Sequence, residues 1–227
     1  FGPHAAELFR NILEEPSMSH QLQALAIEAL GRAKNPQDAK LLKRYLQHSK
    51  PELRAEAITA LVRITGWDAF QLLNALISDP APLVTKRVMA ALGGFATKHD
   101  EAKAALMKAG TSQKLSSEIR SQALRELGQA LPLPREMREI IQQELIKIVF
   151  EGEGWGRRLR LLFGSHSKEQ DRVKLASLDL LGKIGDETAL DKLSRLRISG
   201  KELQFRLAEV LNQLNLRLGT ADHKQAS

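Results

Sequence analysis

A pattern of apolar and polar positions, twelve residues long, occurs six times along this chain. Its copies begin at Leu22, Leu53, Val84, Ile119, Val173 and Leu203. In every copy, positions 1, 5, 9 and 12 carry apolar or small residues, and position 9 is always leucine. Because these positions share one stripe of a helix with about 3.6 residues per turn, each copy predicts a helix that buries one face.

A shorter stretch with helical apolar spacing lies before each copy. These stretches cover roughly residues 5–14, 37–47, 68–77, 100–109, 136–150 and 187–196. Residues typical of turns lie between the stretches and the copies of the pattern, as at Asn35-Pro36 and Pro132-Leu133-Pro134. No segment sustains the alternation of apolar and polar residues that a strand requires. We therefore predict an all-α chain in which each stretch and the copy after it form a helical hairpin.

Small residues recur at two positions of the pattern. Position 5 is alanine in three copies, which suits close approach of neighbouring helices, and position 10 is glycine in four of the six. Glycine is costly in a helix interior, so we expect position 10 to lie near the helix end, where the chain turns.

The repeated segments resemble HEAT repeats, in the short form known from phycobilisome-lyase-type proteins. The best match is residues 79–93, DPAPLVTKRVMAALG, and the second is residues 50–61, KPELRAEAITAL. A repeat period near 31 residues is typical of a helical solenoid. The resemblance extends over nearly the whole chain and implies a right-handed α-solenoid of about six hairpins, forming a single domain over residues 1–227. It also implies a function, because most HEAT-like proteins are scaffolds or adaptors and a minority are enzymes.

The repeat period fails at one place. The copies are spaced by 31, 31, 35, 54 and 30 residues, and the long interval predicts an insertion at about residues 151–166. Trp155 lies between two glycines there, and it either anchors a partner or packs the insertion onto the solenoid. Arg157 and Arg158 follow, and they either contact an acidic group or lie on a solvated helix face.

Basic residues exceed acidic ones, which gives a formal net charge of +7 and favours an acidic protein, nucleic acid or anionic lipid as partner. The second helix of each hairpin is expected to line the concave face. The candidate contacts there, at solvent-side positions, are Arg54, Arg87, Arg120, Arg125 and Lys174. The alternative is a solvated face with internal ion pairs, since Glu28 and Arg32 have the favourable i,i+4 order.

Several kinds of chemistry are excluded or lack support. The absence of cysteine excludes disulfides, thiolate metal sites and cysteine nucleophiles. The six histidines lie far apart and form no His-Glu pair, so we predict no metal site, cofactor or catalytic residue. No run of about 18 apolar residues occurs, which predicts no membrane span. Phe205 and Leu216 lie off the core stripe of the last helix. They form a docking site, form a junction with further sequence, or reflect the ordinary scatter of apolar residues on a surface.

We therefore predict a non-enzymatic scaffold or adaptor that binds a partner protein with an acidic surface. The concave face and the inserted segment would make the contacts. One alternative is a basic solenoid that binds nucleic acid, and another, by resemblance alone, is a subunit similar to chromophore lyases. The chain begins at Phe1, which indicates a removed leader or a piece of a longer protein, and a soluble, cytoplasmic location is favoured.

Overall fold

The computed structural model describes residues 3–151 and 168–225, and within these ranges the regular structure is helical throughout, without a β strand. The chain divides into two compact units, Phe1–Phe95 and Ala96–Ser227. We describe each unit by itself. That both form one continuous domain remains a prediction from the sequence.

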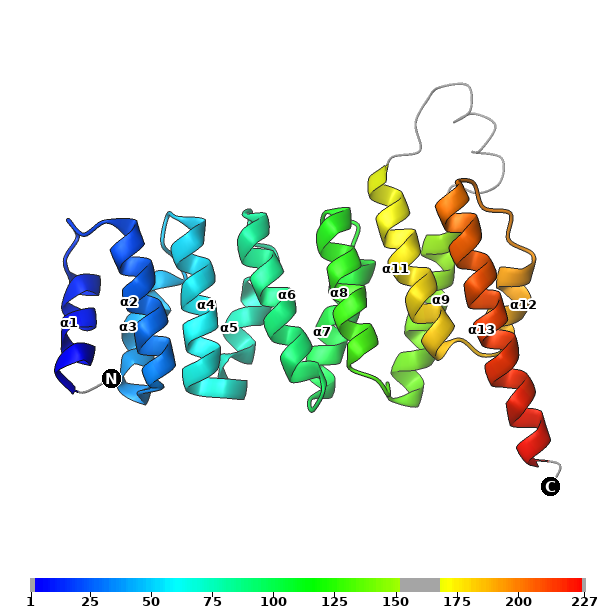
Figure 1. The fold of residues 1–227 in the computed structure, drawn as a ribbon, viewed down its shortest axis with the longest axis horizontal. Helices are drawn as coiled ribbons and strands as arrows, with labels where there is room; N and C mark the ends of the chain where they lie inside the picture. The colour runs from blue at the N-terminus through cyan, green and yellow to red at the C-terminus, as the bar shows by residue number, and fades with distance from the viewer. Residues whose placement is uncertain (1–2, 152–167, 226–227) are drawn as a thin grey trace. The chain divides into compact units, whose positions relative to one another are not determined.

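The first unit consists of three helical hairpins (Figure 1). They comprise α1 (Pro3–Glu14) with α2 (His20–Ala33), α3 (Ala39–Tyr45) with α4 (Pro51–Thr65), and α5 (Phe70–Ala75) with α6 (Pro82–Ala96). Short 3-10 turns, η1 (Pro36–Asp38) and η2 (Gly66–Ala69), lead into α3 and α5. Pro51 and Pro82 each occupy the first helical position, where a missing backbone donor costs nothing.

The second unit repeats the arrangement. Its helices are α7 (Asp100–Thr111), α8 (Ser117–Gln129), α9 (Arg135–Phe150), α11 (Lys168–Ile184), α12 (Glu187–Ser194) and α13 (Lys201–Gln225). Within this unit α8 packs against α11, and α11 packs against α13, so the second helices of successive hairpins are neighbours. The side chain of Ser116 caps α8 by accepting a hydrogen bond from the N–H of Ile119.

All six predicted second helices are confirmed. The copies of the pattern fall in α2, α4, α6, α8, α11 and α13, and in five of the six the helix begins two residues before its copy. The leucines at position 9 are almost fully buried from Leu30 to Leu181, whereas Leu211 in the last copy is half-buried. Leu22 is an exception at position 1, with 45% of its surface exposed. Its hairpin packs on a neighbouring hairpin on one side only.

Close approach of helices explains the small residues. A Cβ atom added to Gly31, at position 10 of α2, would lie 2.7 Å from both Cα and Cβ of Ala60 in α4. Gly31 lies in the last turn of its helix, near the end as expected, but its role there is contact with the next helix rather than a turn.

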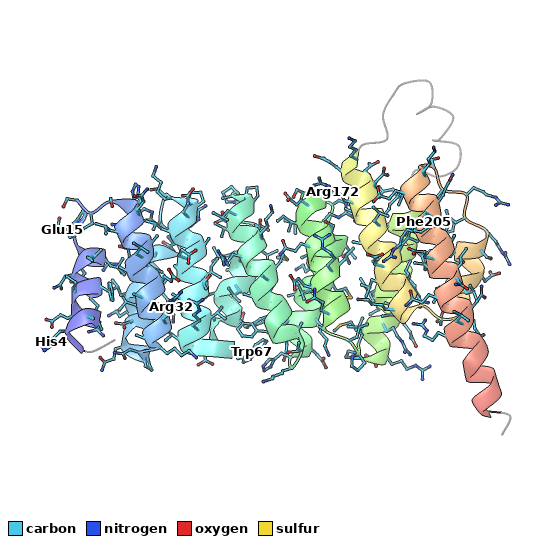
Figure 2. The ribbon with its side chains drawn as sticks, in the orientation of Figure 1. His4, Glu15, Arg32, Trp67, Arg172 and Phe205 are labelled. Carbon is cyan, nitrogen blue, oxygen red and sulfur yellow. The ribbon has the colours of Figure 1, made fainter. Side chains whose placement is uncertain are left out.

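Two further predictions concern the surface. Phe205 and Leu216 are 67% and 63% exposed on α13, as the pattern indicated, and Figure 2 shows the position of Phe205 on that helix. Among the described helices, none combines the length and the apolar character needed to cross a membrane. Of the predicted insertion, only Glu151 lies in the described residues; Trp155, Arg157 and Arg158 lie outside them.

Candidate partner-binding surface

Arg54, which the sequence predicts to contact a partner, instead bonds to residues of its own chain. Its Nη2 and Nε donate hydrogen bonds of 2.7 and 2.9 Å to the two carboxylate oxygens of Asp79. Its Nη1 donates to the carbonyls of His48 and Ser49, at 2.7 and 3.2 Å, in the turn before α4. Only 11% of the Arg54 side chain is exposed. The guanidinium therefore has little capacity left for a partner.

The contacts with Arg54 stabilise the charged form of the Asp79 carboxylate. Burial alone would raise the pKa of Asp79, but the hydrogen bonds from Arg54 and from the N–H of Ala81, together with the charge of Arg54, outweigh burial and lower it. Asp79 thus links the turn before α6 to the start of α4 through a charged, bidentate contact.

Arg120 and Lys174 occupy the same pattern position as Arg54, position 2. The Nε of Arg120 donates a 3.3 Å hydrogen bond to the carbonyl of Gly110 near the end of α7, and burial lowers the pKa of Arg120. Lys174 is only 4% exposed, which corrects the predicted solvent-side placement. Gln204, also at position 2, donates to the carbonyl of Ile198. At Arg54 and Gln204 the side chain at position 2 therefore bonds to the turn before its own helix, and at Arg120 it bonds to the end of the preceding helix.

Arg87 and Arg125 keep their predicted exposure. The Nη2 of Arg87 lies 3.4 Å from a carboxylate oxygen of Glu56 in the neighbouring helix α4, and 41% of the Arg87 side chain is exposed. Arg125 is exposed on α8, and within the described ranges no hydrogen bond or ion pair engages its guanidinium. These two residues lie in different units, and Arg125 borders a cavity.

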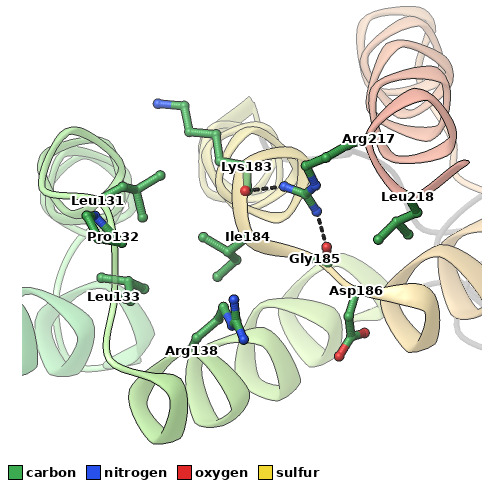
Figure 3. Close-up of a pocket in the computed structure, with 10 residues that line it drawn as sticks. All are labelled: Leu131, Pro132, Leu133, Arg138, Lys183, Ile184, Gly185, Asp186, Arg217 and Leu218. Carbon is green, nitrogen blue, oxygen red and sulfur yellow. Dashed lines mark hydrogen bonds between the residues drawn. The ribbon is translucent and has the colours of Figure 1, made fainter. Parts of the chain in front are cut away.

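Two cavities in the second unit gather basic side chains. The Arg125 cavity, about 230 Å³, is lined by Leu124, Arg125, Gly128, Gln129, Ala176, Asp179, Leu180 and Lys183. The Arg138 cavity, about 550 Å³, is lined by Leu131, Pro132, Leu133, Arg138, Lys183, Ile184, Gly185, Asp186, Arg217 and Leu218 (Figure 3). Lys183 lines both, so the two cavities adjoin. Together their walls carry four basic and two acidic side chains.

Two of these basic side chains, Lys183 and Arg217, cap the C-terminal ends of helices. The Nζ of Lys183 donates a 3.0 Å hydrogen bond to the carbonyl of Gly128 in the last turn of α8. The guanidinium of Arg217 donates to the carbonyls of Gly182, Lys183 and Gly185 at the end of α11 (Figure 3). Cations at these positions satisfy carbonyls that the helix leaves unpaired and oppose the negative end of its dipole.

Arg138 differs from its basic neighbours. It projects from the first turn of α9 into the cavity and is exposed, and in the described part of the chain its guanidinium has no hydrogen bond or ion pair. Burial lowers the pKa of Arg217, and the nearby charge of Arg138 lowers it further, whereas Asp186 opposes this effect. The site therefore holds two close positive charges that an anion would stabilise.

The described residues that line the two cavities include aspartate, lysine and arginine, but no serine, histidine or tyrosine. Within the described residues no group of three potential metal ligands occurs. Arginine and lysine beside leucine, isoleucine and proline instead suit a ligand that is partly anionic and partly apolar.

Sequence reasoning did not select Arg138 or Arg217 as site residues. Arg138 lies in the first turn of a leading helix and Arg217 beyond the end of the last copy, so neither falls on the repeated face that was searched. A signal was present in the turn between α8 and α9, where Leu131 and Leu133 flank Pro132. An apolar turn between two amphipathic helices needs cover from another element, and α11 and α13 supply it.

Comparison with known proteins supports the repeat assignment. Residues 6–84 match the family of HEAT repeats. None of the curated proteins compared with the chain matches it. An engineered protein from the Northeast Structural Genomics Consortium is 18% identical with a TM-score of 0.54, over 94% of this chain and 97% of that one.

Designed armadillo repeat proteins are also similar. One, solved in complex with the peptide (KR)4, is 16% identical with a TM-score of 0.52, over 93% of this chain and 99% of that one. Another is 17% identical with a TM-score of 0.50, over 93% and 100% of the two chains. At these identities the similarity establishes the fold alone. It confirms the all-α solenoid class.

Proposed function

We propose that this chain, in which residues 6–84 are HEAT repeats, is a non-enzymatic scaffold or adaptor that binds an acidic segment of a partner protein. The observation that carries the proposal is the pair of adjoining cavities in the second unit, where Arg125 and Arg138 are exposed and without a bonding partner among the described residues. Exposed charge beside an apolar hollow is typical of a binding surface.

The repeat fold suits this role because it offers a long surface built from similar units. One designed protein of the same fold was solved with the peptide (KR)4. The exposed charge here is basic, so the complementary ligand is acidic. Arg87 in the first unit, and Trp155, Arg157 and Arg158 in the inserted segment, are proposed as further contacts.

The test compares three forms of the full chain in affinity capture from an extract, with bound proteins identified by mass spectrometry. The charge-reversed form carries Arg125→Glu and Arg138→Glu. Its matched control carries Arg197→Glu and Lys201→Glu, which change the same charge at exposed positions outside both cavities. Circular dichroism establishes that all three forms retain their helices.

We expect an acidic protein that the wild-type chain and the control capture and that the charge-reversed form does not. The reason is that only the charge-reversed form places carboxylates where the partner's own carboxylates would lie. Equal capture of the same proteins by all three forms would overturn the proposal.

The nucleic-acid alternative is decided by a second measurement. Duplex and single-stranded oligonucleotides are titrated into the wild-type chain at low and at physiological salt. Binding to nucleic acid would weaken steeply with salt, because neutralised phosphates release counterions. Capture that depends on nucleic acid, and so disappears after nuclease treatment of the extract, would favour the alternative over a protein partner.

A further inference from the structure

The Arg138 cavity has an apolar part and a cationic part. Leu131, Pro132, Leu133, Ile184 and Leu218 form the apolar part, and Figure 3 shows Arg138 and Arg217 beside it. A volume of about 550 Å³ is enough for one or two amino-acid side chains. The ligand that fits must therefore offer an anionic group next to an apolar one.

The two arginines have different roles. Arg217 is committed to the carbonyls of Gly182, Lys183 and Gly185, so it fixes the end of α11 and adds positive charge to the wall. Arg138 comes from another helix and has no such commitment within the described residues. Its five N–H donors remain available for a planar, bidentate contact with a carboxylate.

The acidic residue of the wall does not satisfy Arg138. Asp186 caps α12: its Oδ1 accepts hydrogen bonds from the N–H of Ala189, at 3.0 Å, and from Nε2 of Gln142, at 2.8 Å. Asp186 therefore serves the start of α12 and the contact between α9 and the turn before that helix. Since no acidic side chain among the described residues pairs with Arg138, its guanidinium is available to an external anion.

The apolar part selects among anions. A nucleic-acid strand would gain from aromatic side chains on which bases stack, and none occurs among the described residues that line this cavity. A free phosphate or a purely acidic segment would leave the five apolar residues without a contact. A carboxylate next to an aliphatic side chain uses both parts, because burial of the aliphatic side chain against the apolar part is favourable.

We infer that the Arg138 cavity binds a short peptide segment in which an Asp or Glu side chain pairs with Arg138 and a neighbouring Leu, Ile or Met fills the apolar part. This inference rests on the proposed function, because it names the segment of the partner protein that the scaffold recognises. The acidic group comes from a side chain inside the segment rather than from the end of a chain.

The experiment selects binders from a displayed library of random dodecapeptides with the full chain as target. We expect enrichment of peptides that carry Asp or Glu within two residues of Leu, Ile or Met. The most enriched peptide is then synthesised with both ends blocked, and its affinity is measured by fluorescence anisotropy.

Two substitutions test the pairing. Changing the acidic residue of the peptide to its amide, or Arg138→Gln in the protein, should each weaken binding by about tenfold, as expected for loss of a charge-assisted contact. The two changes together should weaken it little more than either alone, because they remove the same contact. Arg197→Gln is the matched control and should leave the affinity unchanged.

Three outcomes would overturn the inference. One is an enriched peptide that binds the Arg138→Gln protein as tightly as the wild type. Another is binding that requires an unblocked peptide end and ignores the acidic side chain, and the third is a library from which nothing is enriched. None of these decides the proposed function, because the capture experiment also reverses Arg125 and detects folded partners.

Discussion

At the scale of single residues, the contrast between Arg54 and Arg87 is informative. Both are arginines on second helices, at positions 2 and 4 of the pattern, and both were expected to face a partner. Arg54 is enclosed by a turn and by Asp79, whereas Arg87 keeps 41% of its side chain exposed. Both pair with a carboxylate from another element, Arg87 with Glu56, so the position in the repeat rather than the residue type decides how far the arginine stays exposed.

The Arg54–Asp79 pair gives a prediction about stability. Asp79→Asn should lower the free energy of unfolding at neutral pH by about 3 kcal/mol, because it leaves a buried guanidinium without its counter-charge. Urea denaturation measures this. The control is Glu28→Gln, which breaks an exposed pair with Arg32 and should cost less than about 1 kcal/mol. Equal effects of the two changes would contradict the buried role of Asp79.

The same pair predicts a pH dependence. The folded-state pKa of Asp79 is lowered from 3.8, so its stabilisation is fully present above 3.8 and is lost as pH falls through the lowered value. The difference in stability between the wild type and Asp79→Asn should therefore shrink in that acid range. A difference that stays constant to low pH would show that the charge of Asp79 is not its source.

The sequence predicted some residue roles and not others, for a physical reason. Apolar periodicity identifies the side of a helix that faces its own core, so Leu53 and Leu127 could be assigned to the core in advance. It does not show which polar positions a neighbouring turn covers, because that depends on the path of another segment. Arg54 was misplaced for this reason, since the turn at His48 and Ser49 encloses it, and Arg138 was missed because the cavity exists only once four segments meet.

At the scale of elements, the approach of α2 to α4 is limited by Gly31. The pattern located this glycine near a helix end, but its contact with Ala60 depends on how two hairpins stack. The starts of α4 and α6 were easier to predict, because Pro51 and Pro82 mark them in the sequence itself. The 3-10 turns η1 and η2 each overlap the start of a predicted stretch, since one short turn of either helix type has similar apolar spacing.

Two alanine substitutions test this packing. Gly31→Ala should destabilise the protein by about 1–3 kcal/mol, because the new methyl would lie 2.7 Å from the backbone of Ala60 and the helices must separate. Gly94→Ala in α6 meets nothing within 4 Å and should stabilise by about 0.5–1 kcal/mol through helix propensity. Thermal unfolding of the two variants measures both. Stabilisation by both changes would refute the steric role of Gly31.

At the scale of the whole molecule, the chain contains two units, each with its own buried leucines. In repeat proteins each hairpin contacts its neighbours only, so a local loss of stability spreads over a limited distance. The single domain over residues 1–227, which the length and the HEAT-like resemblance imply, stays a prediction. A pattern of this kind records the hairpins and carries no information on how strongly they cooperate.

Hydrogen exchange can measure that cooperation. Leu61→Ala removes a buried side chain from the first unit and Leu127→Ala one from the second. We expect the first change to speed exchange in α2 and α4 and to leave α8 and α11 nearly unchanged, and the second change to do the reverse. Mass spectrometry of peptides from each helix reports both. Acceleration throughout the chain by either change would mean that the two units unfold together.

The hydrogen bonds of the side chains at position 2 also affect how the number of hairpins can change in evolution. Arg54 and Gln204 bind carbonyls only five or six residues earlier, and Arg120 binds one ten residues earlier. Arg54 and Gln204 thus fix the turn before their own helix from within one short stretch of sequence, and Arg120 fixes the end of the preceding helix. When a hairpin is duplicated, the side chain that fixes its turn is duplicated with it. The number of hairpins can therefore change without further substitutions to stabilise each new turn.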